Sequence, residues 1–118
     1  MKRVLKDALS GRYPRIFVGK HGGFDTGDGW YNLLDLLSAR IQAHVDAGKC
    51  PQVEAEQVKE KYGGLRFYYT GGDATVHALV GFAEDLSERT CETCGAPGTP
   101  NDEYGWIRTR CDAHKSER

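Results

Sequence analysis

Four potential metal ligands occupy the last third of the chain, in two pairs of identical spacing. The pairs are Cys91 with Cys94 and Cys111 with His114, and sixteen residues, 95–110, lie between them. Two ligands separated by two residues can reach one ion from a tight turn, and a second such pair completes a tetrahedron. Three thiolates and one imidazole are a donor set of closed structural zinc sites. We therefore predict one Zn²⁺ ion bound by all four side chains.

The alternatives for these two pairs are free thiols that bind no metal, or a redox dithiol at Cys91 and Cys94. A redox motif has no need of a second pair at ligand spacing, and no thioredoxin-like βαβ pattern surrounds this one. With four protein ligands the ion has no open position for water, so we predict a structural site and no catalytic one. Its expected role is to fold a tail that is too short to bury a core alone.

The segment between the two ligand pairs must turn and then return to the ion. Residues 95–98 have the composition of a turn, and residues 104–109 are predicted to form a strand that leads back to Cys111. Cys111 and His114 are then expected on a final turn or a short helix. The whole arrangement resembles a treble-clef or zinc-ribbon module.

Upstream of this tail the sequence predicts helices and a hairpin. Apolar residues recur at steps of three and four over residues 30–45 and again over about 76–89, which is the spacing of one helix face. A shorter helix is expected over residues 2–9. Between the two long helices, residues 52–70 alternate as in a β-hairpin, with its turn at residues 63–64.

The combined prediction is an α+β fold in two parts. Two amphipathic helices are expected to pack on a small antiparallel β-hairpin sheet within residues 1–90, with Asp73 or Thr75 as the cap of the second helix. Residues 91–118 are expected to form a C-terminal zinc module packed on that core. Because the second helix leads directly into Cys91, the module should be rigidly attached.

The composition is that of an ordinary globular domain. Hydrophobic residues make up 39% and charged residues 28% of 118 residues, which suits one domain. No apolar run is long enough for a transmembrane helix, and the N-terminus lacks the apolar core of a signal peptide. Cys50 is left over once the other three cysteines are assigned to zinc, which fits a reducing compartment better than a disulfide framework. We therefore expect a cytoplasmic protein that does not bind membranes.

The net charge of −1 argues against binding of a polyanion by the whole surface. The charge is uneven, however, with +5 over residues 1–20 and −6 over the remainder. The basic segment is either a solvated arm or, together with the polar face of the hairpin around Tyr68, a surface for nucleic acid. The candidate residues for phosphate contacts are Arg12, Arg15, Lys20, Lys59, Lys61 and Arg66.

A glycine-rich loop, residues 19–29, is the first place to look for a small ligand. Five glycines in eleven residues give its backbone unusual freedom. The loop lacks the Gly-Lys-Ser/Thr ending of a P-loop and the glycine spacing of a dinucleotide site. His21, Asp25 and Asp28 carry the weaker hypothesis of a small hydrolase. Asp28 has a simpler expected role as the cap of the following helix.

Four stretches of the sequence carry a resemblance to known proteins. They are DGW at residues 28–30, QVKEKYGGLRFY at 57–68, and CETCG at 91–95 together with GWIRT at 105–109. They resemble an uncharacterised family of small proteins that are frequently encoded by bacteriophages and prophages. The resemblance implies a phage protein in the cytoplasm of a bacterial host cell and carries no catalytic assignment. Small phage proteins of this size often bind a host protein, including components of antiviral defence. By analogy with them, the resemblance also implies binding to a host protein.

The leading functional hypothesis is therefore a non-enzymatic, zinc-stabilised interaction protein that binds a host protein, as an anti-CRISPR-like inhibitor of antiviral defence does. Tyr68 and Trp106 are its candidate anchors, because large rigid side chains bury much area at little entropic cost, and Arg66 is the candidate charged contact. The alternative is a nucleic-acid-binding accessory protein that uses the basic N-terminus, the hairpin face and the zinc module. The hydrolase is the third hypothesis.

Overall fold

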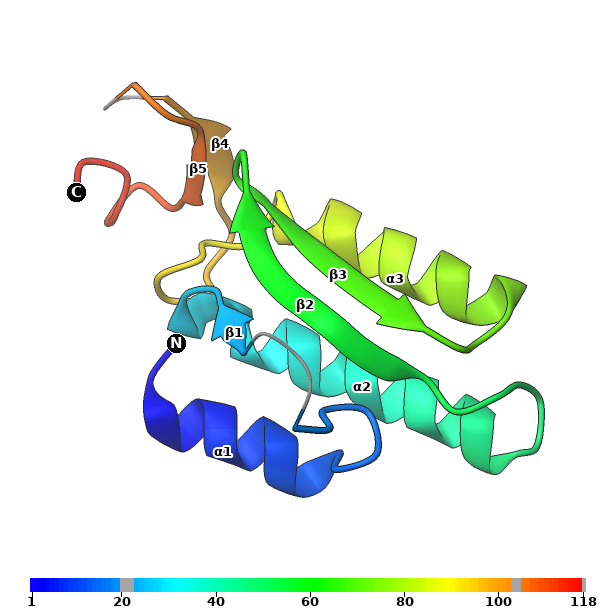
Figure 1. The fold of residues 1–118 in the computed structure, drawn as a ribbon. Helices are drawn as coiled ribbons and strands as arrows, with labels where there is room; N and C mark the ends of the chain where they lie inside the picture. The colour runs from blue at the N-terminus through cyan, green and yellow to red at the C-terminus, as the bar shows by residue number, and fades with distance from the viewer. Residues whose placement is uncertain (20–22, 103–104, 118) are drawn as a thin grey trace.

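A computed structural model describes residues 1–19, 23–102 and 105–117 of the chain (Figure 1). The elements, in order, are α1 (Arg3–Arg12), β1 (Phe24–Asp25), the 3-10 turn η1 (Asp28–Trp30), α2 (Tyr31–Asp46), β2 (Glu54–Lys61), β3 (Gly64–Thr70), α3 (Ala74–Ser87), β4 (Thr99–Asn101) and β5 (Arg108–Arg110). The predicted α+β class is confirmed. Within the described ranges, no helix has the length and apolar character needed to cross a membrane.

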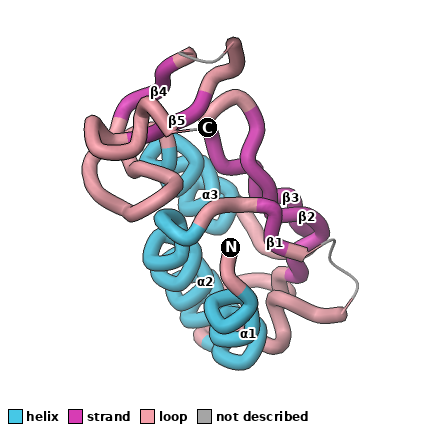
Figure 2. The backbone as a smooth tube through the Cα atoms, turned by 90° about the vertical axis from the view of Figure 1, so that its left-hand side faces the viewer, coloured by secondary structure: helices cyan, strands magenta, loops and turns pink. Residues whose placement is uncertain are grey.

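The helices form one layer and the larger sheet another. Figure 2 shows α1, α2 and α3 side by side, with β1, β2 and β3 along one side of them. The shorter helix predicted over residues 2–9 is present as α1, and it joins the two predicted long helices by packing on α2 with the buried Leu9. This first helix also runs three residues beyond its predicted end. A second small sheet, β4 with β5, lies near the C-terminus.

The larger sheet is a hairpin with one additional strand. β2 and β3 pair antiparallel as predicted, but β1 joins β2 in parallel, with Phe24 opposite Val58. The expectation of a purely antiparallel sheet was therefore wrong. The reason is that Phe24 is buried, with its ring centroid 4.8 Å from that of Phe17, and this packing brings the end of the glycine-rich loop against β2.

The hairpin turn lies one residue earlier than predicted. Lys61 faces Gly64 across the turn, so Tyr62 and Gly63 form the two-residue loop. Both loop residues have positive φ angles, 55° and 83°, as a type I′ turn requires. The register is set by the buried faces, since Val58 pairs with Phe67 in the core.

Helix α3 covers the open edge of β3 (Figure 1). The backbone N–H of Leu65 donates to Ser87 Oγ at 2.8 Å, and that of Phe67 donates to Glu84 Oε2 at 3.0 Å. Strand edges with unpaired N–H groups invite pairing with other chains. Here the side chains of α3 take the place of a further strand.

The two predicted helix caps have different outcomes. Asp73 is the N-cap of α3, and its Oδ1 accepts from the backbone N–H of Val76 at 3.0 Å, as predicted. The hydrogen bond with His44 and then this backbone N–H lower the pKa of Asp73. Asp28 does not cap: no side-chain cap is found for η1 or α2, and its Oδ1 accepts from the backbone N–H of Lys2 at 2.7 Å. Asp28 therefore binds α1's N-cap residue instead of capping the helix that follows it.

The core lies between the helical layer and the larger sheet. Its largest fully buried side chains are Trp30, Leu9, Ile16, Leu34, Ile41, Leu65, Val53, Val58 and Val76. The helical spacing predicts burial of both Leu37 and Leu79. Leu37 is buried, but Leu79 is only partly covered, at the surface between α2 and α3.

These two leucines should therefore differ in their effect on stability. Leu37→Ala is expected to lower the free energy of unfolding by roughly 2–5 kcal/mol, because nearly the whole side chain is out of water and its removal leaves a cavity. Leu79→Ala should cost about 1–2 kcal/mol, since only part of its side chain is out of water. Urea titration of both variants measures the difference. An equal loss would contradict the packing of α3 described here.

Candidate metal centre

The four predicted ligands converge at the C-terminal end of the molecule. One ligand atom each from Cys91, Cys94, Cys111 and His114 lies within 4.8 Å of the others. The sulfurs of Cys94 and Cys111 are 3.7 Å apart, and His114 Nδ1 lies 3.2 Å from the sulfur of Cys111 and 3.8 Å from that of Cys91. Tetrahedral Zn²⁺ would set about 3.8 Å between two sulfurs and about 3.6 Å between sulfur and nitrogen. The four residues thus fit one tetrahedral ion.

Two tight turns present these ligands. The first follows α3, where the backbone N–H of Cys91 donates to the Ala96 carbonyl at 2.8 Å and that of Gly95 donates to the Cys91 carbonyl at 2.9 Å. The second follows β5, where the N–H of His114 donates to the Cys111 carbonyl at 3.0 Å. The predicted final turn at Cys111 and His114 is therefore confirmed.

The two ligand turns are joined by the β4–β5 ribbon. Thr99 pairs with Arg110 and Asn101 with Arg108. The strand predicted over residues 104–109 is shorter than expected: β5 begins only at Arg108, residues 105–107 lie outside it, and residue 104 is outside the described ranges. The return strand nonetheless ends directly before Cys111, as the spacing required.

The thiols of the cluster differ in their acidity. Burial by itself raises the pKa of Cys91, but backbone N–H groups, first that of Cys111, outweigh it and lower this pKa to about 6. The Ala96 N–H lowers the pKa of Cys94, but burial and the neighbouring sulfurs outweigh it, so this pKa is raised. One thiolate is thus favoured at neutral pH, and the remaining thiols would release their protons to solvent as a cation binds.

The ligand turn at Cys91 is bound to the start of α2 by its backbone. The Gly29 N–H donates to the Glu92 carbonyl at 2.7 Å, and the Gly27 N–H donates to Glu92 Oε2 at 2.8 Å. A Cβ atom on Gly29 would lie 2.1 Å from the Cys91 carbonyl oxygen and 2.6 Å from the Gly95 nitrogen. Only glycine fits there. The C-terminal part of the glycine-rich loop thus receives the metal-binding turn, a role that its sequence did not suggest.

Two side chains complete this junction. The Trp30 indole N–H donates to the Thr90 carbonyl at 2.8 Å, and the Thr109 hydroxyl donates to the Gly63 carbonyl at the hairpin turn. Trp30 and Thr109 are both fully buried. The division into a core and a zinc module at residue 90 stays a prediction, but several hydrogen bonds cross that boundary.

The predicted partner-binding residues lie in two separate places. Tyr68 and Arg66 are on β3, with Tyr68 exposed and Arg66 half-buried. Trp106, between β4 and β5, is 53% exposed, and the guanidinium of Arg108 lies 5.0 Å from its ring centroid. Two of the three residues therefore share strand β3, and the third lies in the segment before β5.

The candidate phosphate-binding residues are also divided. Lys59 and Arg66 face each other across β2 and β3. Arg12, in contrast, is bound to Asp35 of the helical layer, with Nη1 3.1 Å from Oδ1. Lys61 lies beside the hairpin turn, with its Nζ 5.6 Å from the Tyr62 ring centroid. Arg15 is exposed in the loop after α1, and Lys20 lies outside the described residues.

The residues of the hydrolase hypothesis are only partly described. His21 lies outside the described residues. Asp28 is engaged with Lys2, whose Nζ is 3.8 Å from Asp28 Oδ2, and Asp25 is exposed on β1 opposite Lys59. Asp28 is therefore occupied in holding the N-terminus.

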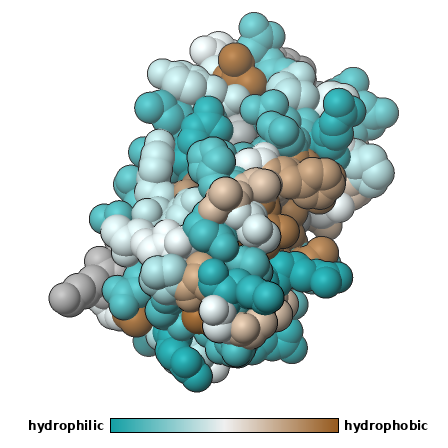
Figure 3. All heavy atoms as spheres, turned by 90° about the vertical axis from the view of Figure 1, so that its right-hand side faces the viewer, coloured by the Kyte–Doolittle hydropathy of each residue, from teal (hydrophilic) through white to brown (hydrophobic). Residues whose placement is uncertain are grey.

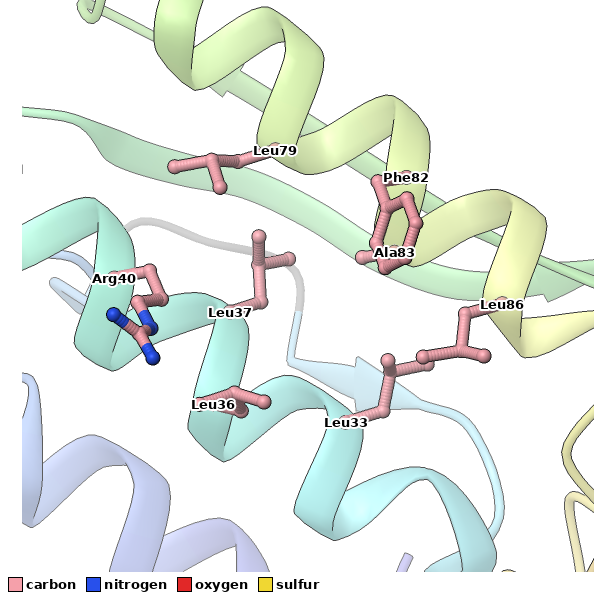
Figure 4. A pocket seen from close by; sticks show the side chains of 8 residues that line it. All are labelled: Leu33, Leu36, Leu37, Arg40, Leu79, Phe82, Ala83 and Leu86. Atoms are coloured by element: carbon pink, nitrogen blue, oxygen red, sulfur yellow. The ribbon is translucent and has the colours of Figure 1, made fainter.

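A groove between α2 and α3 was not predicted from the sequence. It has a volume of about 330 Å³ and is lined by Leu33, Leu36, Leu37, Arg40, Leu79, Phe82, Ala83 and Leu86. Figure 4 shows the leucines of the two helices facing one another, with Arg40 at one end. In Figure 3, apolar side chains gather toward the right of the view, which is the side of the helical layer. Phe82 is 70% and Leu36 56% exposed.

Comparison with known proteins gives no further guide to function. No protein-family model, curated protein or solved structure matches the chain. The kinship with phage-encoded proteins therefore stays a prediction, and the function has to be inferred from the metal cluster and the groove.

Proposed function

We propose that this chain is a non-enzymatic, zinc-stabilised interaction protein that binds a helix of another protein in the groove between α2 and α3. The observation that carries the proposal is the exposure of Phe82 and Leu36 beside an open apolar groove. Proteins in water seldom leave such a patch uncovered unless it binds something. Amphipathic helices bind in grooves of this kind.

The groove has the length of a short helical segment. Its lining residues span positions 33–40 of α2 and 79–86 of α3. Eight helical residues extend about 10–12 Å, or roughly two turns. In Figure 4 Leu33 lies near Leu86 while Leu79 lies near Leu37 and Arg40, so the two helices run in opposite directions. A third helix laid between them would contact both with apolar residues at positions i, i+3 or i+4, and i+7.

Arg40 defines the charge of the expected partner. It is the charged residue of the groove lining, it is exposed, and no hydrogen bond or ion pair joins it to another part of the described structure. A carboxylate on the bound helix would pair with this guanidinium. The partner is therefore a helix with one apolar stripe and an Asp or Glu at the end that meets Arg40. Such a charged contact contributes to orientation and association rate more than to affinity.

The metal cluster has a supporting role in this proposal. We take the ion to be Zn²⁺ and the tail to be a module of the treble-clef or zinc-ribbon kind, on the strength of the Cys₃His donor set. The resemblance to phage proteins suggests that the partner is a bacterial host protein, including a component of antiviral defence. Nucleic-acid binding ranks lower, because Arg12 is paired with Asp35 of the helical layer while Lys59 and Arg66 lie on the hairpin.

The test compares two substitutions at equally exposed apolar positions. Phe82→Asp lies at the groove, whereas Val4→Asp lies on α1, and each wild-type side chain is 70% exposed. Proteins captured from bacterial lysate by the immobilised chain are identified by mass spectrometry, and the purified partner is titrated against each variant. We expect Phe82→Asp to weaken binding by about 2 kcal/mol or more, roughly thirtyfold.

Val4→Asp should bind as the unsubstituted chain does. Arg40→Glu should slow association with the partner, and a partner carboxylate replaced by Lys should restore the rate. Equal binding by Phe82→Asp and Val4→Asp would show that the groove is not the docking site.

A further inference from the structure

A second group of potential metal ligands lies where α2 ends and α3 begins. His44 belongs to the last turns of α2, Cys50 to the loop that follows, and Asp73 is the N-cap of α3. One ligand atom from each lies within 4.8 Å of the other two. His44 and Cys50 are half-buried and Asp73 is exposed, so the group is open to solvent on one side. None of these residues takes part in the Cys₃His cluster.

The backbone holds these segments in close register. The Gly72 N–H donates to the Pro51 carbonyl at 3.2 Å, which joins the segment after Cys50 to the segment before Asp73. Gly71 has a φ angle of 82°, and a Cβ atom there would lie 2.1 Å from the Gln52 carbonyl oxygen. The proximity of Cys50 and Asp73 therefore follows from the packing of the chain on itself.

The two oxygens of the Asp73 carboxylate have separate partners. Oδ1 accepts from the Val76 backbone N–H at 3.0 Å, and Oδ2 lies 2.8 Å from His44 Nε2. The first contact caps α3, and the second joins the carboxylate to His44, another member of the group. One oxygen can therefore bind a cation while the other keeps the helix cap.

We infer that His44, Cys50 and Asp73 form a second metal site, which takes a divalent transition-metal ion of the Zn²⁺ and Co²⁺ class. Imidazole, thiolate and carboxylate are all ligands of such ions, and three protein ligands leave the fourth position to water. Tetrahedral coordination sets about 3.4 Å between nitrogen and oxygen ligands. The 2.8 Å contact of His44 with Asp73 must therefore widen by about half an ångström when the ion binds.

Ion binding at this site replaces protons by metal bonds. The Cys50 thiol gives up its proton to solvent. His44 binds the ion through Nε2 as a neutral imidazole with its proton on Nδ1, so the Nε2 proton moves to Nδ1 or, from a protonated ring, to solvent. The ion would then join α2 to α3 beside the end of the groove that carries Arg40. With one ligand fewer than the Cys₃His cluster, this site binds its ion more weakly and exchanges it more readily. The inference does not depend on what the groove binds.

The test uses the full chain, first loaded with one equivalent of Zn²⁺ at the Cys₃His cluster, and then titrated with Co²⁺. We expect one further equivalent to bind, with a thiolate-to-cobalt charge-transfer band and the visible bands of tetrahedral cobalt. Cys50→Ser should abolish the charge-transfer band of the second site. A band that persists in this variant would come from cobalt that has displaced zinc from the Cys₃His cluster. Asp73→Asn should weaken cobalt binding by at least about tenfold.

Two features keep this experiment independent of folding. Asn is as good an N-cap as Asp, so Asp73→Asn retains the cap of α3. His77→Gln is the matched control, because His77 is an exposed histidine of the same helix that lies outside the group. This control should bind cobalt as the unsubstituted chain does.

A second readout follows Cys50 directly. Zn²⁺ in excess of the first equivalent should protect Cys50 from alkylation by iodoacetamide, because the bound thiolate is no longer free to react. The inference is overturned if the zinc-loaded chain binds no further cobalt, if the second equivalent gives the same spectrum in Cys50→Ser, or if excess Zn²⁺ leaves the alkylation rate of Cys50 unchanged.

Discussion

Cys94→Ser is expected to release the metal ion and to unfold the tail beyond Thr90. Structural zinc sites contribute about 10–16 kcal/mol of apparent binding free energy, which is folding free energy for a segment with little core of its own. In the described tail the buried residues are Cys91, Arg108 and Thr109. Nothing else of comparable strength would hold β4 and β5 near the core. Metal analysis and amide hydrogen exchange measure the two effects.

The informative amides are those that cross the tail. The N–H of Glu92 donates to the Thr109 carbonyl at 3.0 Å, and that of Gly98 donates to the Arg89 carbonyl at 2.9 Å. Both should lose protection in Cys94→Ser. Cys50→Ser is the matched control, since it removes the one cysteine outside the cluster and should keep the Cys₃His ion. Full protection of both amides in metal-free protein would contradict the structural role of the ion.

Trp30→Ala is expected to lower the free energy of unfolding by about 3–5 kcal/mol. Trp30 is the largest fully buried side chain, and large aromatic residues leave cavities of that cost. Its indole N–H also satisfies the Thr90 carbonyl, which would lose its partner. Trp30→Phe separates the two effects, because it keeps an aromatic ring and removes the donor. This variant should lose roughly 1–3 kcal/mol.

The other tryptophan of the chain provides the comparison. Trp106 is 53% exposed and contacts the guanidinium of Arg108, so Trp106→Ala should lose about 1 kcal/mol or less. Urea titration, followed by circular dichroism so that every variant gives a signal, measures all three losses. A loss in Trp106→Ala equal to that in Trp30→Ala would mean that the core is assigned to the wrong tryptophan.

Local spacing accounts for the parts of the structure that were predicted correctly. Within each pair, only two residues separate the ligands, so the turn between them fixes their geometry. The return strand needed only to end before Cys111. The alternation over residues 52–70 likewise predicted the hairpin that β2 and β3 form. These patterns are complete within a few residues.

The features that were missed depend on contacts between distant segments. The loop glycine Gly29 has no local pattern that indicates a neighbour at Glu92, so the reason for its small size appears only in the fold. Phe82 follows the apolar spacing of α3, and this spacing is the same whether the side chain faces the core or an open groove. His44 and Asp73 are likewise far apart in sequence. The spacing of apolar residues indicates which face of a helix is apolar, but it does not indicate what covers that face.

The hydrogen bond from the Trp30 indole N–H to the Thr90 carbonyl joins positions 60 residues apart. It therefore bears on the order in which the molecule folds. Contacts between distant positions carry the entropic cost of closing a long loop, so they tend to form after the helices and the hairpin. Interactions that form after the transition state slow unfolding more than they speed folding. The metal ion, acting on this late junction, would then set how long the native state lasts once it has formed, rather than how quickly it is reached.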